Sequence, residues 1–229
     1  MTGKMKIKIM KNGPYEVTGG VPISKKVIAR TQEGVLGLKK VKDYKPADPQ
    51  KYYLCRCGRS GAMPFCDGTH AAHPFDGTEV ADRRKYADRA ELQSGPDLDL
   101  LDDNRCAFAR FCHRQRGEVW TLTEYSNDPE NRRQAIEGIT ECPAGRLVAR
   151  DKTGRVIEKK FEPEIEIVED PLKECSAGIY VKGGIEIESA DGTLYEARNR
   201  VALCRCGHSK NMPFCDAAHV SIGFHDNDS

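Results

Sequence analysis

Two stretches of the chain place three cysteines and one histidine at the same intervals. They read CRCGRSGAMPFCDGTH and CRCGHSKNMPFCDAAH, each with a Cys-x-Cys pair, a third Cys after eight further residues and a His after three more. Thiolate and imidazole are common protein ligands of zinc and iron. The repeated spacing predicts two metal centres, with candidate ligands Cys55, Cys57, Cys66 and His70 in the first stretch and Cys204, Cys206, Cys215 and His219 in the second.

The spacing also bears on which metal these residues bind. Three cysteines and a histidine permit a structural zinc site, but zinc modules usually present Cys-x2-Cys pairs. The Cys-x-Cys pairs found here favour an iron–sulfur cluster. In each stretch the third cysteine and the histidine stand four apart, so a helix opening there would direct both toward one point. The N-terminal amides of that helix would then face an anionic cluster.

A second cysteine pattern lies in the middle of the chain. Cys106 and Cys112 are six apart, and Cys142 is followed by proline. This matches part of a bacterial ferredoxin run, C-x2-C-x2-C with a remote Cys-Pro, but Ala109 stands where the middle ligand would be. Three thiolates suit a 3Fe–4S cluster, or a 4Fe–4S cluster whose fourth iron takes another ligand. The alternative is that these cysteines are small buried residues without a cluster.

The remaining cysteine and histidines fit neither pattern. We interpret Cys175 as a plain thiol, buried or at the surface. The histidines outside the ligand intervals are interpreted as surface or core residues: His73, His113, His208 and His225.

Short strands are expected to deliver the chain into both ligand stretches. Residues 52–54 precede the first stretch and residues 201–203 the second. Residues 13–23 and 178–187 each carry a Gly-Gly pair between apolar residues, which predicts two short strands joined at a tight turn. The alternating Lys and apolar residues of 1–10 predict a further strand.

The copies differ mainly at residues 31–49 of the first, which have no counterpart in the second and are predicted to form a turn-rich surface loop. Unrelated sequence separates the copies. Within it, residues 97–103 form an expected acidic loop and residues 118–125 alternate as a strand. Asp128-Pro129 favours a helix from there to about residue 139, followed by a strand over 146–150.

Both ligand stretches resemble the CDGSH iron–sulfur domain of mitoNEET-type proteins. Its pattern, C-x-C-x2-S/T-x3-P-x-C-D-G-S/A/T-H, is matched throughout the first stretch and departs in the second only at Ala217, where Gly is expected. If the backbone there needs a positive φ, the second site is slightly strained or its turn differs. The resemblance implies one 2Fe–2S cluster per motif, with two cysteines on one iron and Cys plus His on the other.

The resemblance also bears on architecture. Family members form an intertwined dimer with a strand-built cap, so two copies in one chain could build a pseudo-dimer internally, and the protein could be a monomer. The central segment resembles the divergent single-cluster ferredoxin domain. We therefore expect an α+β, β-rich fold with two small CDGSH-type units, 1–75 and 166–229, flanking a ferredoxin-like insert, 76–165.

Composition narrows the remaining functions. Of 229 residues, 38% are hydrophobic, which favours small metal-stapled cores over a single large one. The net charge of +1 argues against a nucleic-acid footprint or a polybasic membrane attachment. We find neither an export signal nor an apolar run long enough for a membrane span. A cytoplasmic protein is expected, with its ten cysteines in metal or redox chemistry rather than disulfides.

No nucleophile–base set, phosphate loop or dinucleotide fingerprint is found, so a non-enzymatic role is expected. The favoured function is one-electron, proton-coupled transfer to a redox partner through two 3Cys-1His 2Fe–2S clusters, with a third cluster if the central cysteines hold one. One alternative is a protein that transfers its clusters to an acceptor protein or senses redox state or pH. A further alternative is a zinc-stapled interaction module.

Overall fold

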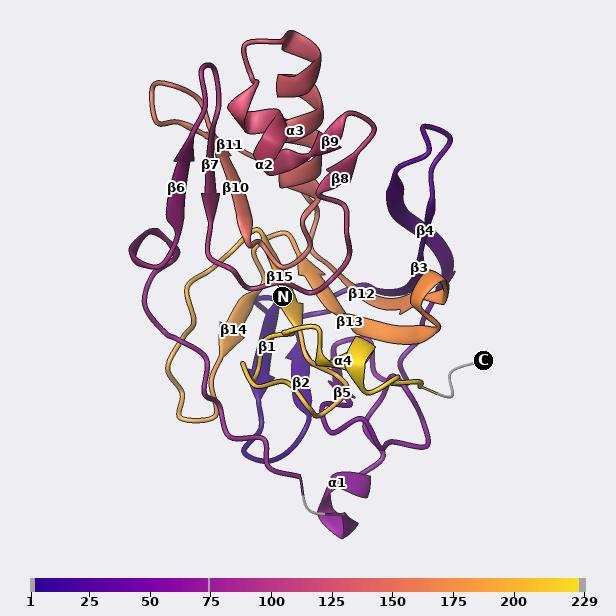
Figure 1. Cartoon of the computed structure of the whole chain (residues 1–229). Coiled ribbons are helices and arrows are strands. Elements are labelled where there is room, and N and C mark those ends of the chain that lie inside the picture. Colours follow the sequence, from indigo (N-terminus) through magenta and orange to yellow (C-terminus); the bar gives the residue numbers. More distant parts are fainter. Residues whose placement is uncertain (1–2, 74, 227–229) are drawn as a thin grey trace.

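Two sheets form the body of the molecule (Figure 1) in the computed structural model, which describes residues 3–73 and 75–226. The first sheet has the order β14-β1-β2-β5, and the second has the order β15-β13-β12-β3-β4. Strands of the first sheet are β1 (Lys6–Ile9), β2 (Tyr15–Thr18), β5 (Lys51–Leu54) and β14 (Glu186–Glu188). Strands of the second are β3 (Ile23–Arg30), β4 (Leu36–Asp43), β12 (Glu164–Asp170), β13 (Cys175–Lys182) and β15 (Arg200–Leu203).

Each repeat contributes to the sheet of the other: the second repeat lends β14, and the first lends β3 and β4. β14 of the second repeat pairs in parallel with β1, placing Ile187 opposite Ile7. β3 of the first repeat pairs in parallel with β12, placing Ile23 opposite Ile165. The chain thus builds within itself the intertwined pseudo-dimer that the resemblance implies.

The two Gly-Gly pairs make this exchange and do not close hairpins. The strands on either side of each pair exist, but β2 and β3 lie in different sheets, as do β13 and β14. Gly19 and Gly20 have φ of 87° and 71°, and Gly183 and Gly184 have 78° and 71°. Two successive positive φ values, which glycine adopts readily, turn the chain out of one sheet and into the next. The predicted tight turns are therefore corners between sheets.

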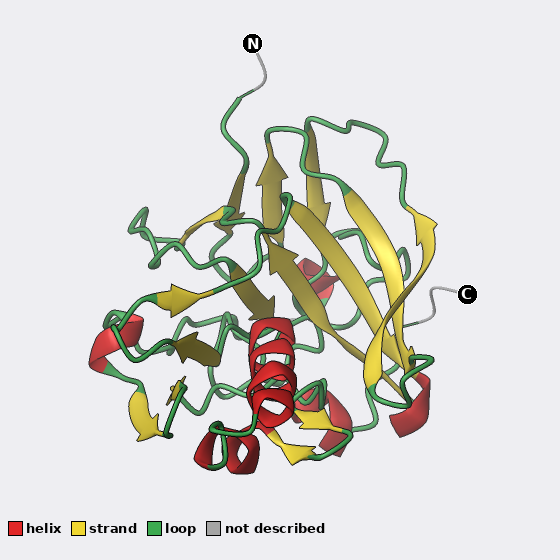
Figure 2. Cartoon of the chain, turned by 90° about the horizontal axis from the view of Figure 1, so that it is seen from above, coloured by secondary structure: helices red, strands yellow, loops and turns green. Residues whose placement is uncertain are grey.

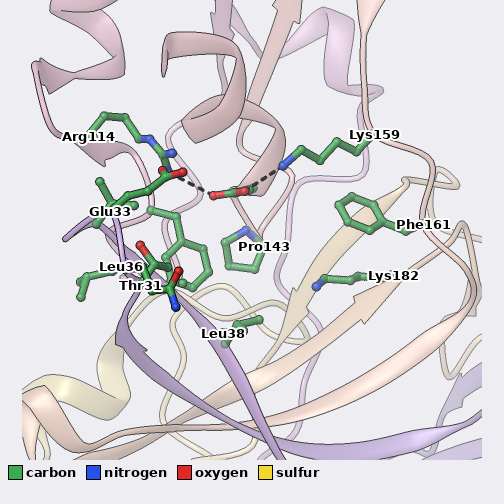
Figure 3. A pocket seen from close by; sticks show the side chains of 14 residues that line it. Thr31, Glu33, Leu36, Leu38, Arg114, Pro143, Lys159, Phe161 and Lys182 are labelled. Carbon is green, nitrogen blue, oxygen red and sulfur yellow. Dashed lines mark hydrogen bonds and ion pairs between the residues drawn. The ribbon is translucent and has the colours of Figure 1, made fainter. Parts of the chain in front are cut away.

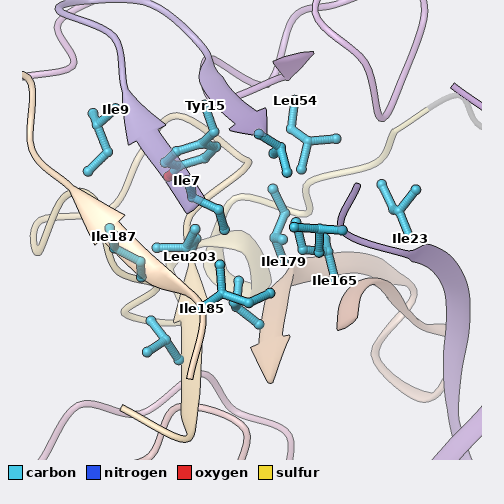
Figure 4. Packing of buried hydrophobic residues seen from close by; sticks show 14 of the residues in the cluster. Ile7, Ile9, Tyr15, Ile23, Leu54, Ile165, Ile179, Ile185, Ile187 and Leu203 are labelled. Atoms are coloured by element: carbon cyan, nitrogen blue, oxygen red, sulfur yellow. The ribbon is translucent and has the colours of Figure 1, made fainter. Parts of the chain in front are cut away.

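The inner faces of the two sheets enclose the main core (Figure 4). Alternate residues of each strand point inward, so Ile7 and Ile9 of β1 meet Ile179 of β13 and Leu203 of β15 in one buried cluster. The outer face of the second sheet carries a separate cluster, in which Tyr180 packs with residues 107, 109 and 111 of the insert. The insert therefore covers the outer face of the second sheet, to which both repeats contribute, since Ile28 of β3 lies in the same cluster.

The insert has its own small sheet, of order β11-β10-β7-β6, with two helices beside it (Figure 2). Its elements are β6 (Glu91–Ser94), β7 (Asp99–Asp102), α2 (Val119–Glu124), α3 (Pro129–Glu141), β10 (Leu147–Arg150) and β11 (Val156–Ile157). Apolar residues of β7, β10 and both helices form its core. The predicted helix is confirmed as α3, with the Asp128 carboxylate accepting hydrogen bonds from the amides of Glu130 and Asn131.

The predicted strand over 118–125 is wrong, because this segment forms α2. Its buried residues are Val119, Leu122 and Thr123, which have the spacing of a helix face, and the Thr123 hydroxyl donates to the Val119 carbonyl at 2.7 Å. The alternation that indicated a strand came from β-branched residues. These residues also occur in a helix here, because α3 provides an apolar surface against which α2 packs.

Two predicted loops contain strands. Within residues 31–49, the eight-residue strand β4 pairs antiparallel with β3 through seven residue pairs. Most of its side chains face solvent, which explains why its sequence lacks apolar alternation. Within residues 97–103, β7 lies between β6 and β10. Its half-buried carboxylates are paired, Asp99 with Lys152 and Asp102 with Arg146, which allows acidic residues in a central strand.

The remaining elements are short. They are α1 (Thr69–Ala72), η1 (Tyr86–Asp88), β8 (His113–Arg114), β9 (Gly117–Glu118), η2 (Pro171–Lys173) and α4 (Ala218–Ser221). No helix in the described part of the chain is both long and apolar enough to cross a membrane.

Candidate metal centres

The first ligand stretch folds so that its four candidate ligands stand as two pairs. β5 ends at Leu54, and the Cys55 and Cys57 sulfurs that follow lie 3.7 Å apart. The Cys66 sulfur lies 3.4 Å from Nδ1 of His70. A tetrahedral metal with bonds of roughly 2.0–2.3 Å has ligand atoms separated by roughly 3.3–3.8 Å, so each pair is spaced to bind one metal atom.

The second stretch repeats this arrangement. The Cys204 and Cys206 sulfurs are 3.5 Å apart, and the Cys215 sulfur lies 3.5 Å from Nδ1 of His219. Among residues 3–73 and 75–226, no three His, Cys, Asp or Glu side chains converge closely enough to hold one metal ion. Each site is thus a pair of bidentate half-sites, which fits a centre of two metal atoms better than a single closed tetrahedron.

Backbone amides favour the thiolate form at the first cysteine of each site. The Cys57 thiol donates to Cys55 and lowers its pKa to about 6 against the effect of burial, and the amides of residues 58–60 lower it further. The Cys206 thiol and nearby amides likewise lower the pKa of Cys204 to about 7. Since the thiolate is the metal ligand, one cysteine of each pair is favoured in its ligating form, while the same hydrogen bond raises the pKa of its partner, Cys57 or Cys206.

The two ligand loops touch each other at the centre of the pseudo-dimer. Cys57 and Cys206 form an isolated antiparallel β-bridge. The next residues, Gly58 and Gly207, have φ of 75° and 79°. A Cβ on Gly58 would lie 2.5 Å from the Cys206 carbonyl oxygen, and one on Gly207 would lie 2.4 Å from that of Cys57. Glycine is needed here both for backbone conformation and for close approach.

A buried arginine stands between the two cysteines of each pair. Arg56 is 1% exposed and donates to the carbonyls of Gly13, Gly77 and Met10 at 2.7–2.9 Å. Arg205 is equally buried and donates to the Ala177 carbonyl at 2.7 Å. These guanidinium groups tie each loop to surrounding chain and place positive charge beside an anionic centre. Sequence reasoning missed them, although the shared letters CRC were a visible signal.

Further hydrogen bonds hold both loops in one shape. The Ser60 hydroxyl donates to the Phe65 carbonyl at 2.6 Å, and Ser209 donates to Phe214 at 2.6 Å. Asp67 accepts from the amides of Gly61 and Thr69, and Asp216 accepts from the corresponding amides, those of Lys210 and Ala218. The Ser and Asp residues that the two stretches share thus hold each loop in its shape through hydrogen bonds within the loop.

The third cysteine precedes the short helix of each site. α1 and α4 begin at Thr69 and Ala218, so Cys66 and Cys215 lie before the first turn. Asp67 accepts the Thr69 amide at 3.0 Å, whereas the amides of Gly68 and Ala217 bond to the Cys66 and Cys215 sulfurs and oppose the rise in pKa that burial causes there. The role of helix amides toward a cluster stays a prediction. The residue before α4 is Ala217, with φ of 70°, where Gly68 has 89°. The positive φ anticipated for Ala217 is confirmed.

The two sites differ in exposure. His219 and Cys215 are 2% and 4% exposed, whereas His70 and Cys66 are only half-buried. Burial, then the Arg205 charge, lowers the pKa of His219 to about 4. The second site is therefore enclosed by protein, and the first faces the surface.

The central cysteines line one small cavity of about 30 Å³. Cys106, Cys112 and Cys142 contribute to it, and Ala109 lines it where a fourth cysteine would stand. Phe108 and Arg110 have φ of 59° and 63°, so the chain curls tightly here. A positive φ costs free energy in a residue other than glycine, and residues with this conformation often lie at functional sites.

Burial disfavours the thiolate form at two of the central cysteines. It raises the pKa of Cys112 to about 12 and raises that of Cys142 as well. The Arg146 side chain lies within hydrogen-bonding reach of Cys106, an interaction that, after its bond with Asp102, raises the pKa of Arg146. A cation beside these sulfurs suits an anionic cluster, and this residue was also missed from the sequence.

A larger cavity, of about 610 Å³, adjoins the central site (Figure 3). Its wall includes Phe111 and Pro143, the direct neighbours of Cys112 and Cys142. β4 supplies Leu36 and Leu38 to the opposite side, so the segment present only in the first repeat helps to enclose it. The cavity thus reaches within one residue of two candidate ligands.

Residues outside the ligand patterns lie where the sequence interpretation allowed. Cys175 is buried at the start of β13. The four other histidines are exposed: His73, His113, His208 and His225.

Comparison with protein families accounts for most of the chain. The model described as iron-binding zinc finger CDGSH type matches residues 12–71 and again 177–220. The model described as divergent 4Fe-4S mono-cluster matches residues 93–152. No curated protein and no solved structure matches the chain significantly.

Proposed function

Since the chain carries two CDGSH-type iron-binding domains around a divergent 4Fe–4S mono-cluster domain, we propose that it is a non-catalytic electron-transfer protein. It would hold two 2Fe–2S clusters and a central 3Fe–4S or 4Fe–4S cluster. When bound, such clusters take up and release single electrons. The observation that carries the two 2Fe–2S assignments is the pairing of ligands at 3.4–3.7 Å, twice in each of two sites.

The serial arrangement of the sites supports electron relay. The first and second sites meet through the Cys57–Cys206 bridge. The pKa of Cys215 is raised by burial and further by the negative charges of Cys204 and Cys106, so the central site lies within electrostatic range of the second. Neighbouring redox centres allow an electron to pass from one to the next, whereas transfer of a cluster to an acceptor protein does not require neighbouring clusters.

The imidazole ligands support proton coupling at the first site. In both sites Nδ1 faces the partner cysteine, which leaves Nε2 free to bind a proton. His70 is half-buried, so its Nε2 is the one that can exchange protons with solvent. One neutral ligand among three thiolates should also set the potential between those of all-cysteine and two-histidine centres.

Cluster transfer is the second candidate function, favoured by the exposure of Cys66 and His70. An acceptor protein could reach this half-site directly, whereas Cys215 and His219 are covered. The two functions differ in what they need from the insert, because transfer from the first site needs no central cluster.

The test is spectroscopy of anaerobically purified protein with iron and sulfide counts. We expect visible absorption and paramagnetic signals on reduction. The iron count should exceed four per chain, the number that two 2Fe–2S clusters supply. A triple variant, Cys106→Ser, Cys112→Ser and Cys142→Ser, should lose only the excess iron. A colourless zinc protein would refute the iron–sulfur proposal. A wild-type count of four would refute the relay, and transfer to an apo-ferredoxin would then be measured.

A further inference from the structure

Tyr180 occupies the boundary between the second repeat and the insert. It lies on β13 opposite Ala202 and points to the outer face of the sheet, away from the main core. Its side chain is fully buried and packs with residues 107, 109 and 111 of the loop that carries Cys106 and Cys112. This ring therefore fills the space between two candidate metal centres.

The Tyr180 hydroxyl is buried without a hydrogen-bond partner in the described structure. The four other buried tyrosines each have an acceptor at 2.7–2.9 Å, namely the carbonyls of Cys204, Val21 and Leu101 and the carboxylate of Glu79 for Tyr15, Tyr52, Tyr86 and Tyr195. An unsatisfied buried hydroxyl costs folding free energy and calls for an explanation. A bound group that supplies an acceptor would remove this cost.

Cys215 and the loop that carries Cys106 and Cys112 both pack in the same cluster as Tyr180. Gly178 is two residues earlier on the same face of β13, and a Cβ there would lie 3.5 Å from the Cys215 sulfur. Burial raises the pKa of Tyr180 well above its usual range, and the negative charges of Cys215, Asp170, Cys142 and Cys106 raise it further. Asp170 is already engaged by Arg110 at 2.6 and 3.0 Å. A cluster bound at either sulfur site would add sulfide acceptors beside the hydroxyl.

We propose that the Tyr180 hydroxyl donates a hydrogen bond to a sulfide of an iron–sulfur cluster at this boundary, held either by the second CDGSH-type site or by the central cysteines. The inference rests on the proposed function and adds a residue that neither cysteine pattern contains. A donor to cluster sulfur stabilises the more negative, reduced state and so raises the reduction potential. Tyr180 is thus a positioning residue that tunes one centre and packs between two.

The test is Tyr180→Phe, with the midpoint potential of each centre followed by paramagnetic resonance during redox titration. We expect either the second-site centre or the central centre to shift to lower potential. The potential of the first-site centre, held by Cys55 and its partners, should stay unchanged. The centre that shifts identifies which cluster accepts the hydrogen bond. The matched control is Tyr52→Phe, which removes a buried hydroxyl bonded to the Val21 carbonyl. It should leave the midpoint potentials of the second-site centre and of the central centre unchanged. Unchanged potentials in Tyr180→Phe would overturn the proposal.

Stability of cluster-free protein gives a second readout. Without clusters, Tyr180→Phe should unfold at the same or a higher temperature than wild type, because it removes an unpaired buried hydroxyl. With clusters bound, that relative gain should be lost. A variant less stable than wild type in the cluster-free state would show a structural role and overturn the inference. Wild-type protein without iron would instead refute the proposed function, so the two failures are distinguishable.

Discussion

Replacing Gly58 by alanine should weaken both CDGSH-type sites through one contact. The new Cβ would lie 2.5 Å from the Cys206 carbonyl oxygen, well inside the about 3.3–3.6 Å at which carbon meets a carbonyl oxygen. The obstacle is backbone, so no side chain can rotate away. The φ of 75° adds a separate cost, because an L-residue in the left-handed region is disfavoured by about 1–2 kcal/mol.

The expected destabilisation is the sum of these two effects. Overpacking of this kind costs about 1–3 kcal/mol, which with the backbone cost gives about 2–5 kcal/mol for Gly58→Ala. Gly68→Ala is the matched control, since its φ is 89° and no heavy atom lies within 4 Å of the added Cβ. The control should cost only about 1–2 kcal/mol. For a chain of this size each 1 kcal/mol lowers the unfolding temperature by about 2–4 °C.

Denaturant unfolding of cluster-free protein measures both variants. In loaded protein, chelator-driven iron loss from the second site should be faster in Gly58→Ala than in Gly68→Ala, because the displaced carbonyl belongs to Cys206. Equal unfolding free energies for the two variants, or iron loss confined to the first site, would refute the reasoning that the two loops support each other.

Three further predictions concern single residues. Ala217→Gly should raise the free energy of unfolding by up to about 1 kcal/mol, since relief of the left-handed strain exceeds the entropy cost of glycine; denaturant titration measures this. Arg56→Met should cost about 2 kcal/mol or more by leaving the buried carbonyls of Gly13 and Gly77 without donors and should release iron from the first site, whereas the exposed Arg59→Met should do neither. In cluster-free protein the lowered pKa of His219, about 4, means that the unfolded chain gains a proton below about pH 6.5 while the folded chain does not. The free energy of unfolding should therefore fall between about pH 6.5 and 4, and less so in His219→Gln.

Local patterns in the sequence predicted the ligand sets, because the ligands of each loop are close in the chain, but they did not reveal Arg56 and Arg205, whose partners lie far away in the sequence. Spacing placed Cys66 beside His70, and the positive φ at Ala217 followed from its alignment with Gly68. The pairing of β14 with β1 could not be read locally, since it depends on contacts between strands about 180 residues apart. Nor did any pattern mark Tyr180, whose significance comes from the insert packing across β13.

The strand exchange between repeats has a consequence for how the two sites can evolve. In a symmetric dimer of identical chains, every substitution appears at both sites at once. Here the partners are joined in one polypeptide, so each site varies alone. Counted from the Gly-Gly pairs, Tyr15 of β2 corresponds to Ile179 of β13, and Gly68 of the first motif corresponds to Ala217 of the second. The cysteine-bearing loop of the insert packs beside Cys215 of the second site. A single gene can therefore adjust an open site and an enclosed site separately while the shared sheets keep them in contact.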